Sequence, residues 1–166
     1  VIHTLHLPSL SDMYKWVSVT YQFGLALPIS LLKKVTTNFN DGEYYNFQDF
    51  FSKAEYENPP IILEWDTVRT RHELLAEWYI EEKLKPTISQ RLITLLNAID
   101  IDNMYERSIF NSLLRRKTIV RKYLTGLKKN ELEYLQQKSA KNPVTKRNVM
   151  MMSGWIEYLK GNSTFA

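Results

Sequence analysis

Apolar side chains recur at helical spacing along most of the chain, which predicts a mainly α-helical protein. Caps, glycines and prolines bound the expected helices, which span about residues 9–23, 28–35, 46–53, 70–84, 89–98, 104–124, 130–139 and 145–160. Residues 61–65 and 67–69 are instead two short runs of β character, and they predict a hairpin. The pattern therefore predicts helices with one small β hairpin.

The stretch that follows this hairpin carries the most detailed signals. Thr70 and Glu73 have the Ser/Thr-x-x-Glu spacing of a capping box, so we place a helix start at Thr70. The expected apolar side of this helix consists of Leu74, Leu75, Ala76, Trp78, Ile80 and Leu84. The expected solvated side consists of Glu73, Glu77, Glu81, Glu82, Lys83 and Lys85. Pro86 ends the helix, because the residue before a proline disfavours the α conformation.

A histidine and two arginines gather where this helix is expected to begin. His72 falls in the first turn, at position N2, and Arg69 and Arg71 flank it. A helix N-terminus exposes unpaired N–H groups and the positive end of the helix dipole, so these side chains are suited to an anion such as a phosphate. A solvated surface or a structural cap is the commoner setting for such residues, and both interpretations stay open here.

Two helices in the N-terminal part are joined by a short turn. Gly24 supplies the backbone freedom that a C′ position favours, and Pro28 opens the second helix where a missing N–H costs little. The result is a helix-turn-helix arrangement. The outward residues of the third expected helix and just beyond it are Gln48, Asp49, Ser52, Lys53 and Glu55. Four of these five residues are acidic or neutral and one is a lysine, which argues against DNA contact through that helix.

Composition narrows the classes of protein to consider. The chain has 166 residues, of which 44% are hydrophobic and 13% aromatic, so it can bury a core. It contains no cysteine, which excludes disulfides, thiolate catalysis and cysteine-ligated zinc. No apolar run approaches the roughly 18 residues of a transmembrane helix, so we expect no membrane span. Because the chain does not begin with Met, we expect it to be a fragment of a longer protein.

Charge divides the chain into two contrasting halves. Residues 1–85 carry 8 Lys and Arg against 12 Asp and Glu, a net charge of −4, whereas residues 86–166 carry 14 against 6, a net charge of +8. The densest basic stretch contains Arg115, Arg116, Lys117, Arg121 and Lys122. Such a half is suited to nucleic acid, to an acidic protein surface or to another domain of the same polypeptide.

The motifs of the common catalytic sites are missing from the chain. It has no Gly-x-x-x-x-Gly-Lys-Ser/Thr phosphate loop and no Gly-x-Ser-x-Gly elbow. His72-Glu73 begins like a zinc-protease motif, but Ala76 stands where the second histidine is required. We therefore expect no enzyme activity and no metal site in this chain.

Two segments resemble a known family. Residues 71–77, Arg-His-Glu-Leu-Leu-Ala-Glu, are similar to the Arg-His-x-x-(Ile/Leu)-Ala-Glu segment of bacterial STAND NTPases. These are multidomain signalling ATPases related to the NACHT and NB-ARC switch proteins, and they include antiviral defence proteins. Residues 21–32 resemble the Phe-Gly-x-x-(Leu)-Pro-(Ile)-x-Leu-Leu element that precedes that segment in the family. The similarity covers roughly residues 9–85.

The resemblance implies a winged-helix domain over residues 1–85 and a helical bundle over residues 86–166. In the wider class a Met-His-Asp histidine contacts the β-phosphate of bound ADP and holds the switch closed. His72 matches that histidine, whereas Arg71 replaces Met and Glu73 matches Asp only in charge. Arg69 and Arg71 would then be secondary anion contacts.

The same resemblance implies the partners. ADP or ATP would be held by an adjacent NTPase domain, and a sensor domain would belong to the same cytoplasmic polypeptide. Activation would involve a homo-oligomer, in prokaryotic antiviral defence. Two alternatives remain: a DNA-binding winged helix that touches phosphates through residues 115–122, and a helical interaction module that binds no small ligand.

Overall fold

The computed structural model describes residues 10–36 and 60–161. The described chain is mainly helical with a small three-stranded antiparallel sheet, which confirms the predicted predominance of helix. It divides into two compact units, Val1–Lys85 and Pro86–Ala166. The division falls at the proline that the sequence also marks as a boundary. The third expected helix, residues 46–53, lies outside the described residues.

The first unit begins with a buried helix, α1 (Leu10–Tyr21). Met13, Val17 and Val19 are almost completely shielded from solvent, as the apolar pattern predicts. Gly24 ends the helix with a positive φ of 73°, and its N–H donates to the carbonyl of Tyr21 at 2.8 Å. Glycine is favoured here because this backbone conformation is costly for residues with a Cβ.

A short strand and a second helix follow the turn. Strand β1 (Leu27–Pro28) leads into α2 (Ile29–Val35), with Pro28 at the N-cap, one residue before the position that the sequence suggested. The sequence did not predict β1, because two residues leave no alternating pattern. It is revealed only by its pairing with a distant strand, in which Leu27 lies opposite Val68.

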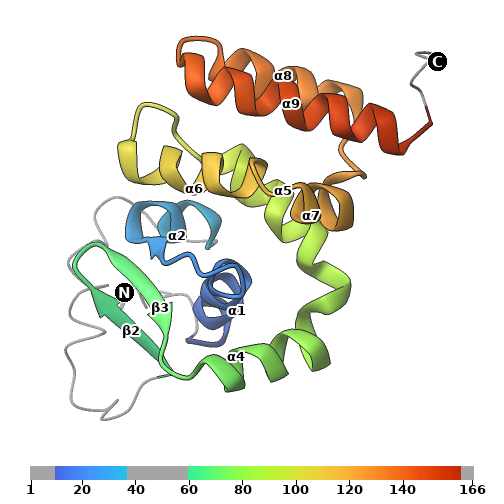
Figure 1. Ribbon diagram of the computed structural model, residues 1–166. Helices are drawn as coiled ribbons and strands as arrows, with labels where there is room; N and C mark the ends of the chain where they lie inside the picture. Colours follow the sequence, from blue (N-terminus) through green and yellow to red (C-terminus); the bar gives the residue numbers. More distant parts are fainter. Residues whose placement is uncertain (1–9, 37–59, 162–166) are drawn as a thin grey trace, which may run out of the picture. The chain divides into compact units, whose positions relative to one another are not determined.

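The predicted hairpin forms close to its expected position. Strands β2 (Ile61–Glu64) and β3 (Thr67–Thr70) pair antiparallel, and the sheet order is β1-β3-β2. Ile61, Val68 and Thr70 are buried, and β3 packs against α1 (Figure 1). At the tip, Trp65 takes a positive φ of 55°, as the first central residue of a primed hairpin turn does.

The predicted start of the next helix at Thr70 is wrong. Thr70 is the last residue of β3 and pairs with Ile61, and the N–H of Arg71 still donates to the carbonyl of Pro60 at 2.8 Å. Helix α4 (Glu73–Tyr79) therefore begins two residues later than predicted, with His72 rather than Thr70 as its N-cap. Backbone pairing within the sheet overrides the local capping-box signal.

The predicted apolar side of this helix is correct for three of its six residues and wrong for the other three. Leu74 and Trp78 are 80% and 56% exposed, and Leu75 is exposed too, whereas Ala76, Ile80 and Leu84 are buried. The π-helical turn η2 (Ile80–Leu84) follows α4, and the 3₁₀ turn η3 (Lys85–Thr87) follows η2. A π turn closes i→i+5 bonds and takes up more residues than the 3.6 of an α-helical turn.

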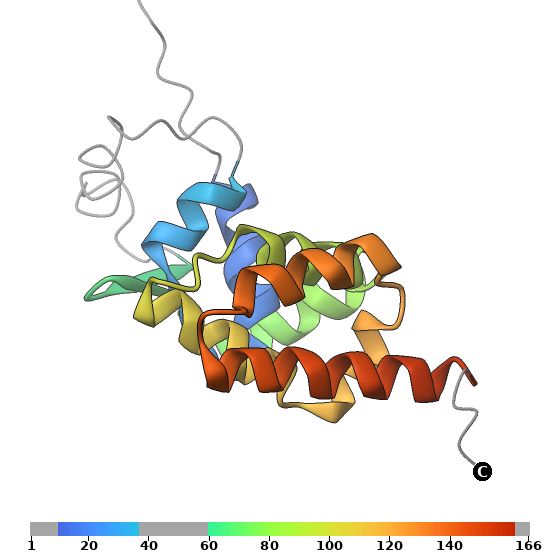
Figure 2. The same cartoon turned by 90° about the horizontal axis from the view of Figure 1, so that it is seen from above.

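The second unit consists of helices joined by short turns. Its elements are α5 (Ile88–Ala98), α6 (Met104–Leu114), α7 (Lys117–Ile119), the π turn η4 (Val120–Leu124), α8 (Lys129–Ser139) and α9 (Pro143–Leu159). Helices α8 and α9 lie side by side (Figure 2). Asn148 of α9 donates to Asn111 of α6 at 2.8 Å, which joins those two helices through a polar contact.

The long helix predicted over residues 104–124 is interrupted. Arg116 adopts an extended conformation between α6 and α7. A straight helix would carry Lys117 and Arg121 onto the side that buries Phe110 and Leu113. Because the helix is broken at Arg116, Lys117 and Arg121 remain exposed. Ile119, at the end of α7, is buried.

Among the helices of residues 10–36 and 60–161, none combines the length and the apolar character that crossing a membrane requires.

Candidate functional site

His72 lies at the junction between the sheet and α4. Its backbone is extended, with φ −123° and ψ 110°, and its side chain is exposed. The imidazole accepts no hydrogen bond from the helix N–H groups, although His72 occupies the capping position. The side chain therefore contributes nothing to the start of α4, and it is accessible to a ligand from solvent.

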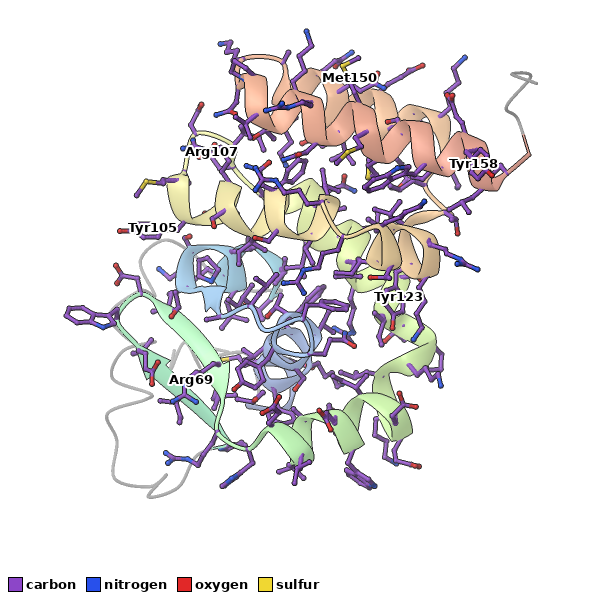
Figure 3. The ribbon with its side chains drawn as sticks, viewed as in Figure 1. Arg69, Tyr105, Arg107, Tyr123, Met150 and Tyr158 are labelled. Carbon is purple, nitrogen blue, oxygen red and sulfur yellow. The ribbon has the colours of Figure 1, made fainter. Side chains whose placement is uncertain are left out.

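Arg69 is engaged within the hairpin. Its Nη2 lies 2.7 Å from Oε1 of Glu64 on the neighbouring strand, and its Nη1 donates to the carbonyl of Thr70 at 3.3 Å (Figure 3). The hydrogen bond to Arg69 holds the pKa of Glu64 below its ordinary value, and the same bond raises the pKa of Arg69. Both terminal nitrogens of Arg69 are therefore already hydrogen-bonded within the hairpin, which weakens its expected role as an anion contact.

Arg71 shares a side of the chain with Arg69. Residues two apart on an extended strand point the same way, and the alternate residues Val68 and Thr70 are buried. Arg71 is half-buried, and its backbone extends the pairing of the sheet by one hydrogen bond. The structure therefore brings Arg69 and Arg71 to one side, immediately before the exposed His72.

The basic stretch of the second unit is exposed but not a single helical face. Arg115, Arg116, Lys117, Arg121 and Lys122 are all exposed. They are distributed over the end of α6, the break and the α7–η4 segment. The ammonium group of Lys122 lies 5.2 Å from the ring centroid of Tyr123, which orients one of these cations. The arrangement concentrates positive charge on a bend of the chain.

A cleft of about 460 Å³ in the second unit has no counterpart in the sequence patterns. It is lined by Asn97, Ala98, Ile99, Asp100, Ile101, Asp102, Arg107, Tyr134, Gln137, Lys138, Lys141 and Asn142. Arg107 donates to the carbonyl of Ile101 at 2.8 Å, and Lys138 donates to the carbonyls of Leu96 and Asn97 at 3.0 and 2.8 Å. These cations fix the end of α5 and the loop after it, a structural role for the polar lining.

The part of the chain that the structure describes contains no group of three His, Asp or Glu side chains placed to hold a metal ion. Comparisons with protein-family models, with curated proteins and with solved structures find no match to the chain. His72 and the exposed basic stretch, Arg115, Arg116, Lys117, Arg121 and Lys122, are therefore the candidate functional sites of the described residues.

Proposed function

We propose that this chain is a regulatory segment of a STAND-type signalling ATPase, with a winged-helix-like first unit and a helical second unit. The support is the order of the elements: two helices joined by a Gly24 turn, a hairpin, and then His72 at the start of a helix. The exposed imidazole, which the helix does not use as a cap, is the observation that carries the proposal. Catalysis would belong to an adjacent domain of a cytoplasmic protein that acts in prokaryotic defence.

His72 would bind the β-phosphate of an ADP or ATP molecule held by that adjacent domain. An imidazole N–H can donate a hydrogen bond to a phosphate oxygen. Arg71, on the side of the chain next to it, would be a secondary contact, and Arg69 a weaker one because of its bond to Glu64. Loss of the histidine contact would shift a two-state protein toward its active form.

The test is His72→Ala in the full-length protein. One charge-assisted hydrogen bond is worth about 1.5–3 kcal/mol, so ADP retention should fall by roughly ten-fold or more and spontaneous signalling should rise. Glu82→Gln, an exposed change on the turn after the same helix, is the control and should leave both unchanged. Wild-type nucleotide retention and basal signalling in His72→Ala would refute the role of the imidazole.

A second candidate function is nucleic-acid binding by the second unit. Five exposed cations fall within residues 115–122, a stretch without an acidic residue, and residues 86–166 carry a net charge of +8. Duplex DNA affinity should then fall steeply with salt, because each phosphate contact releases counterions. Replacing Lys117 and Arg121 with Ala should reduce the salt slope by about two. Lys128→Ala with Lys129→Ala is the matched control, and equal losses in both double variants would exclude a localised site.

A further inference from the structure

The cleft of the second unit is lined by charged side chains of both signs. Three cations, Arg107, Lys138 and Lys141, line it together with two carboxylates, Asp100 and Asp102, so the lining carries a net charge of +1. Within the part of the chain that the structure describes, neither Arg107 nor Lys141 forms an ion pair with either carboxylate. The cleft therefore presents positive and negative groups to a ligand.

Two of these cations retain N–H groups that can bind an anion. Arg107, on α6 (Figure 3), donates from Nη1 to the carbonyl of Ile101 at 2.8 Å, and a guanidinium has five N–H groups in all. Lys141, in the turn after α8, is exposed, and its ammonium group has no hydrogen-bond or ion-pair partner among the described residues. A guanidinium and an ammonium group that line one cleft are suited to a phosphate.

The two carboxylates lie in the loop between α5 and α6. Oδ1 of Asp100 accepts from the backbone N–H of Asp102 at 2.9 Å, which restrains the Asp100 side chain. The carboxylate of Asp102 is exposed and has no partner among the described residues. Ionised carboxylates are acceptors only, and they bind hydroxyl groups, as an acidic residue binds the ribose 2′-OH in dinucleotide sites. They also repel a second anion, so the ligand that fits the cleft carries hydroxyl groups beside its phosphate.

Tyr134 adds an aromatic ring to the lining. The residue, on α8, is 48% exposed, and the ammonium group of Lys138 lies 5.5 Å from its ring centroid. This cation–π contact restrains the ring at the wall of the cleft. A partly exposed aromatic ring can pack on the apolar face of a sugar or stack on a nucleobase.

We propose that this cleft binds a sugar phosphate, either free or as the ribose phosphate of a nucleotide. Arg107 and Lys141 contact the phosphate, Asp100 and Asp102 accept from the sugar hydroxyl groups, and Tyr134 packs on the sugar or on the base. The cleft volume of about 460 Å³ falls within the roughly 300–1,000 Å³ of small-ligand sites.

The cleft lies entirely within the unit Pro86–Ala166, so its ligand does not involve His72 and is independent of the proposed function. The experiment is isothermal titration calorimetry of the full chain with ribose 5-phosphate, adenosine 5′-monophosphate, ribose and inorganic phosphate. Both phosphorylated sugars should bind. Ribose or phosphate alone should bind at least about ten-fold more weakly, because each lacks part of the contacts.

The same titrations distinguish the two sources of a sugar phosphate. Affinity for adenosine 5′-monophosphate no higher than for ribose 5-phosphate would identify the free sugar phosphate. Tighter binding of the nucleotide that is lost in Tyr134→Leu would identify a nucleotide, because that variant removes the stacking surface.

Two variants separate the phosphate contacts from the hydroxyl contacts. Lys141→Ala should weaken ribose 5-phosphate by roughly ten-fold or more, the value of one hydrogen bond to a charged group, and should weaken inorganic phosphate too. Asp102→Ala should weaken ribose 5-phosphate by a similar factor without weakening phosphate, because it removes a hydroxyl acceptor and a repelling charge. Both side chains are exposed, so both variants should keep the wild-type melting temperature.

Lys146→Ala, which changes an exposed lysine of α9 outside the cleft lining, is the matched control. It should bind ribose 5-phosphate like the wild type, and so should His72→Ala. The absence of binding of both phosphorylated sugars at millimolar concentration would overturn the proposal. So would phosphate alone binding as tightly as ribose 5-phosphate, or unchanged affinity in Lys141→Ala, or equal losses in Lys141→Ala and Lys146→Ala.

Discussion

The starts of α4 and α6 differ in what their N-cap residues do. Asn103 caps α6 with a side chain that accepts from the N–H groups of Tyr105 and Glu106, at 3.0 and 3.1 Å. His72 occupies the same position in α4 and forms no such bond. The first position is explained by folding alone, since its side chain satisfies N–H groups that would otherwise be unpaired. His72 forms no side-chain cap bond, and the same is true at the starts of α2, α5 and α7.

The largest difference between the two helix starts should come from the glutamates in their first turns, Glu106 in α6 and Glu73 in α4, as a change in the free energy of unfolding. Glu106 is almost fully buried, and its Oε1 accepts from the N–H of Asp100 at 3.1 Å. Glu106→Ala should therefore cost about 2–3 kcal/mol in the free energy of unfolding, through the lost acceptor and the cavity. Glu73→Ala, at an exposed position of α4, should stay within about 0.5 kcal/mol. Urea denaturation of both variants measures this difference, and equal losses would remove the contrast.

The N-cap of α6 should show the next largest effect. Asn103→Ala should destabilise the protein by about 1 kcal/mol, because two N–H groups lose their acceptor. Asn103→Asp is the matched control, since its carboxylate can accept the same bonds and is favoured at a helix N-terminus. Thermal melts of both variants test this, and a neutral Asn103→Ala would show that the side-chain bonds are not needed.

The N-cap of α4 should be nearly insensitive to the same change. His72→Ala should alter the free energy of unfolding by less than about 0.5 kcal/mol, since no side-chain cap bond is lost. Circular dichroism melts of the isolated chain measure it. A loss above 1 kcal/mol would mean that the imidazole has a structural role, and it would remove the argument for binding.

The smallest effect should come from the ion pair beside this junction. The pKa of Glu64 is lowered in the folded protein by Arg69, from a reference value of 4.5. The pair therefore contributes stability above that reference value, and this contribution is lost as pH falls through the lower folded pKa. Wild type and Glu64→Gln should differ slightly at pH 7 in urea denaturation, and the difference should shrink as the pH falls below 4.5 and through the lower folded pKa of Glu64. If the difference in the free energy of unfolding between the two proteins persisted in acid, the packing of the side chain rather than its charge would be its cause.

The sequence predicted best what neighbouring residues determine. Gly24 marks the end of a helix through a backbone preference that a short window contains, and the helix expected from residue 104 begins at Met104. The hairpin also formed within a residue of its expected bounds. The winged-helix assignment and the role of His72 remain proposals, because both derive from a resemblance that no comparison supports.

The sequence-based predictions were wrong where contacts between residues far apart in the chain determine the local structure. Thr70 became the end of a strand because Ile61 and Pro60 pair with that segment, which a capping signal cannot reveal. Leu74 and Trp78 are exposed and Ala76 is buried because the packing of α4 on the distant α1 decides which side of the helix is covered. Sequence reasoning also missed the bonds of Lys138 to carbonyls 41 and 42 residues earlier, for which no local signal exists.

The two bonds of Lys138 also have a consequence for how the second unit folds. They join α8 to the last turn of α5 across more than 40 residues, so the intervening chain must close into a loop before they can form. Contacts within each helix carry no such entropic cost and form in microseconds or less. Docking of α8 on α5 is therefore a late event in folding. The reverse step, release of Lys138, would be an early local opening of the folded unit.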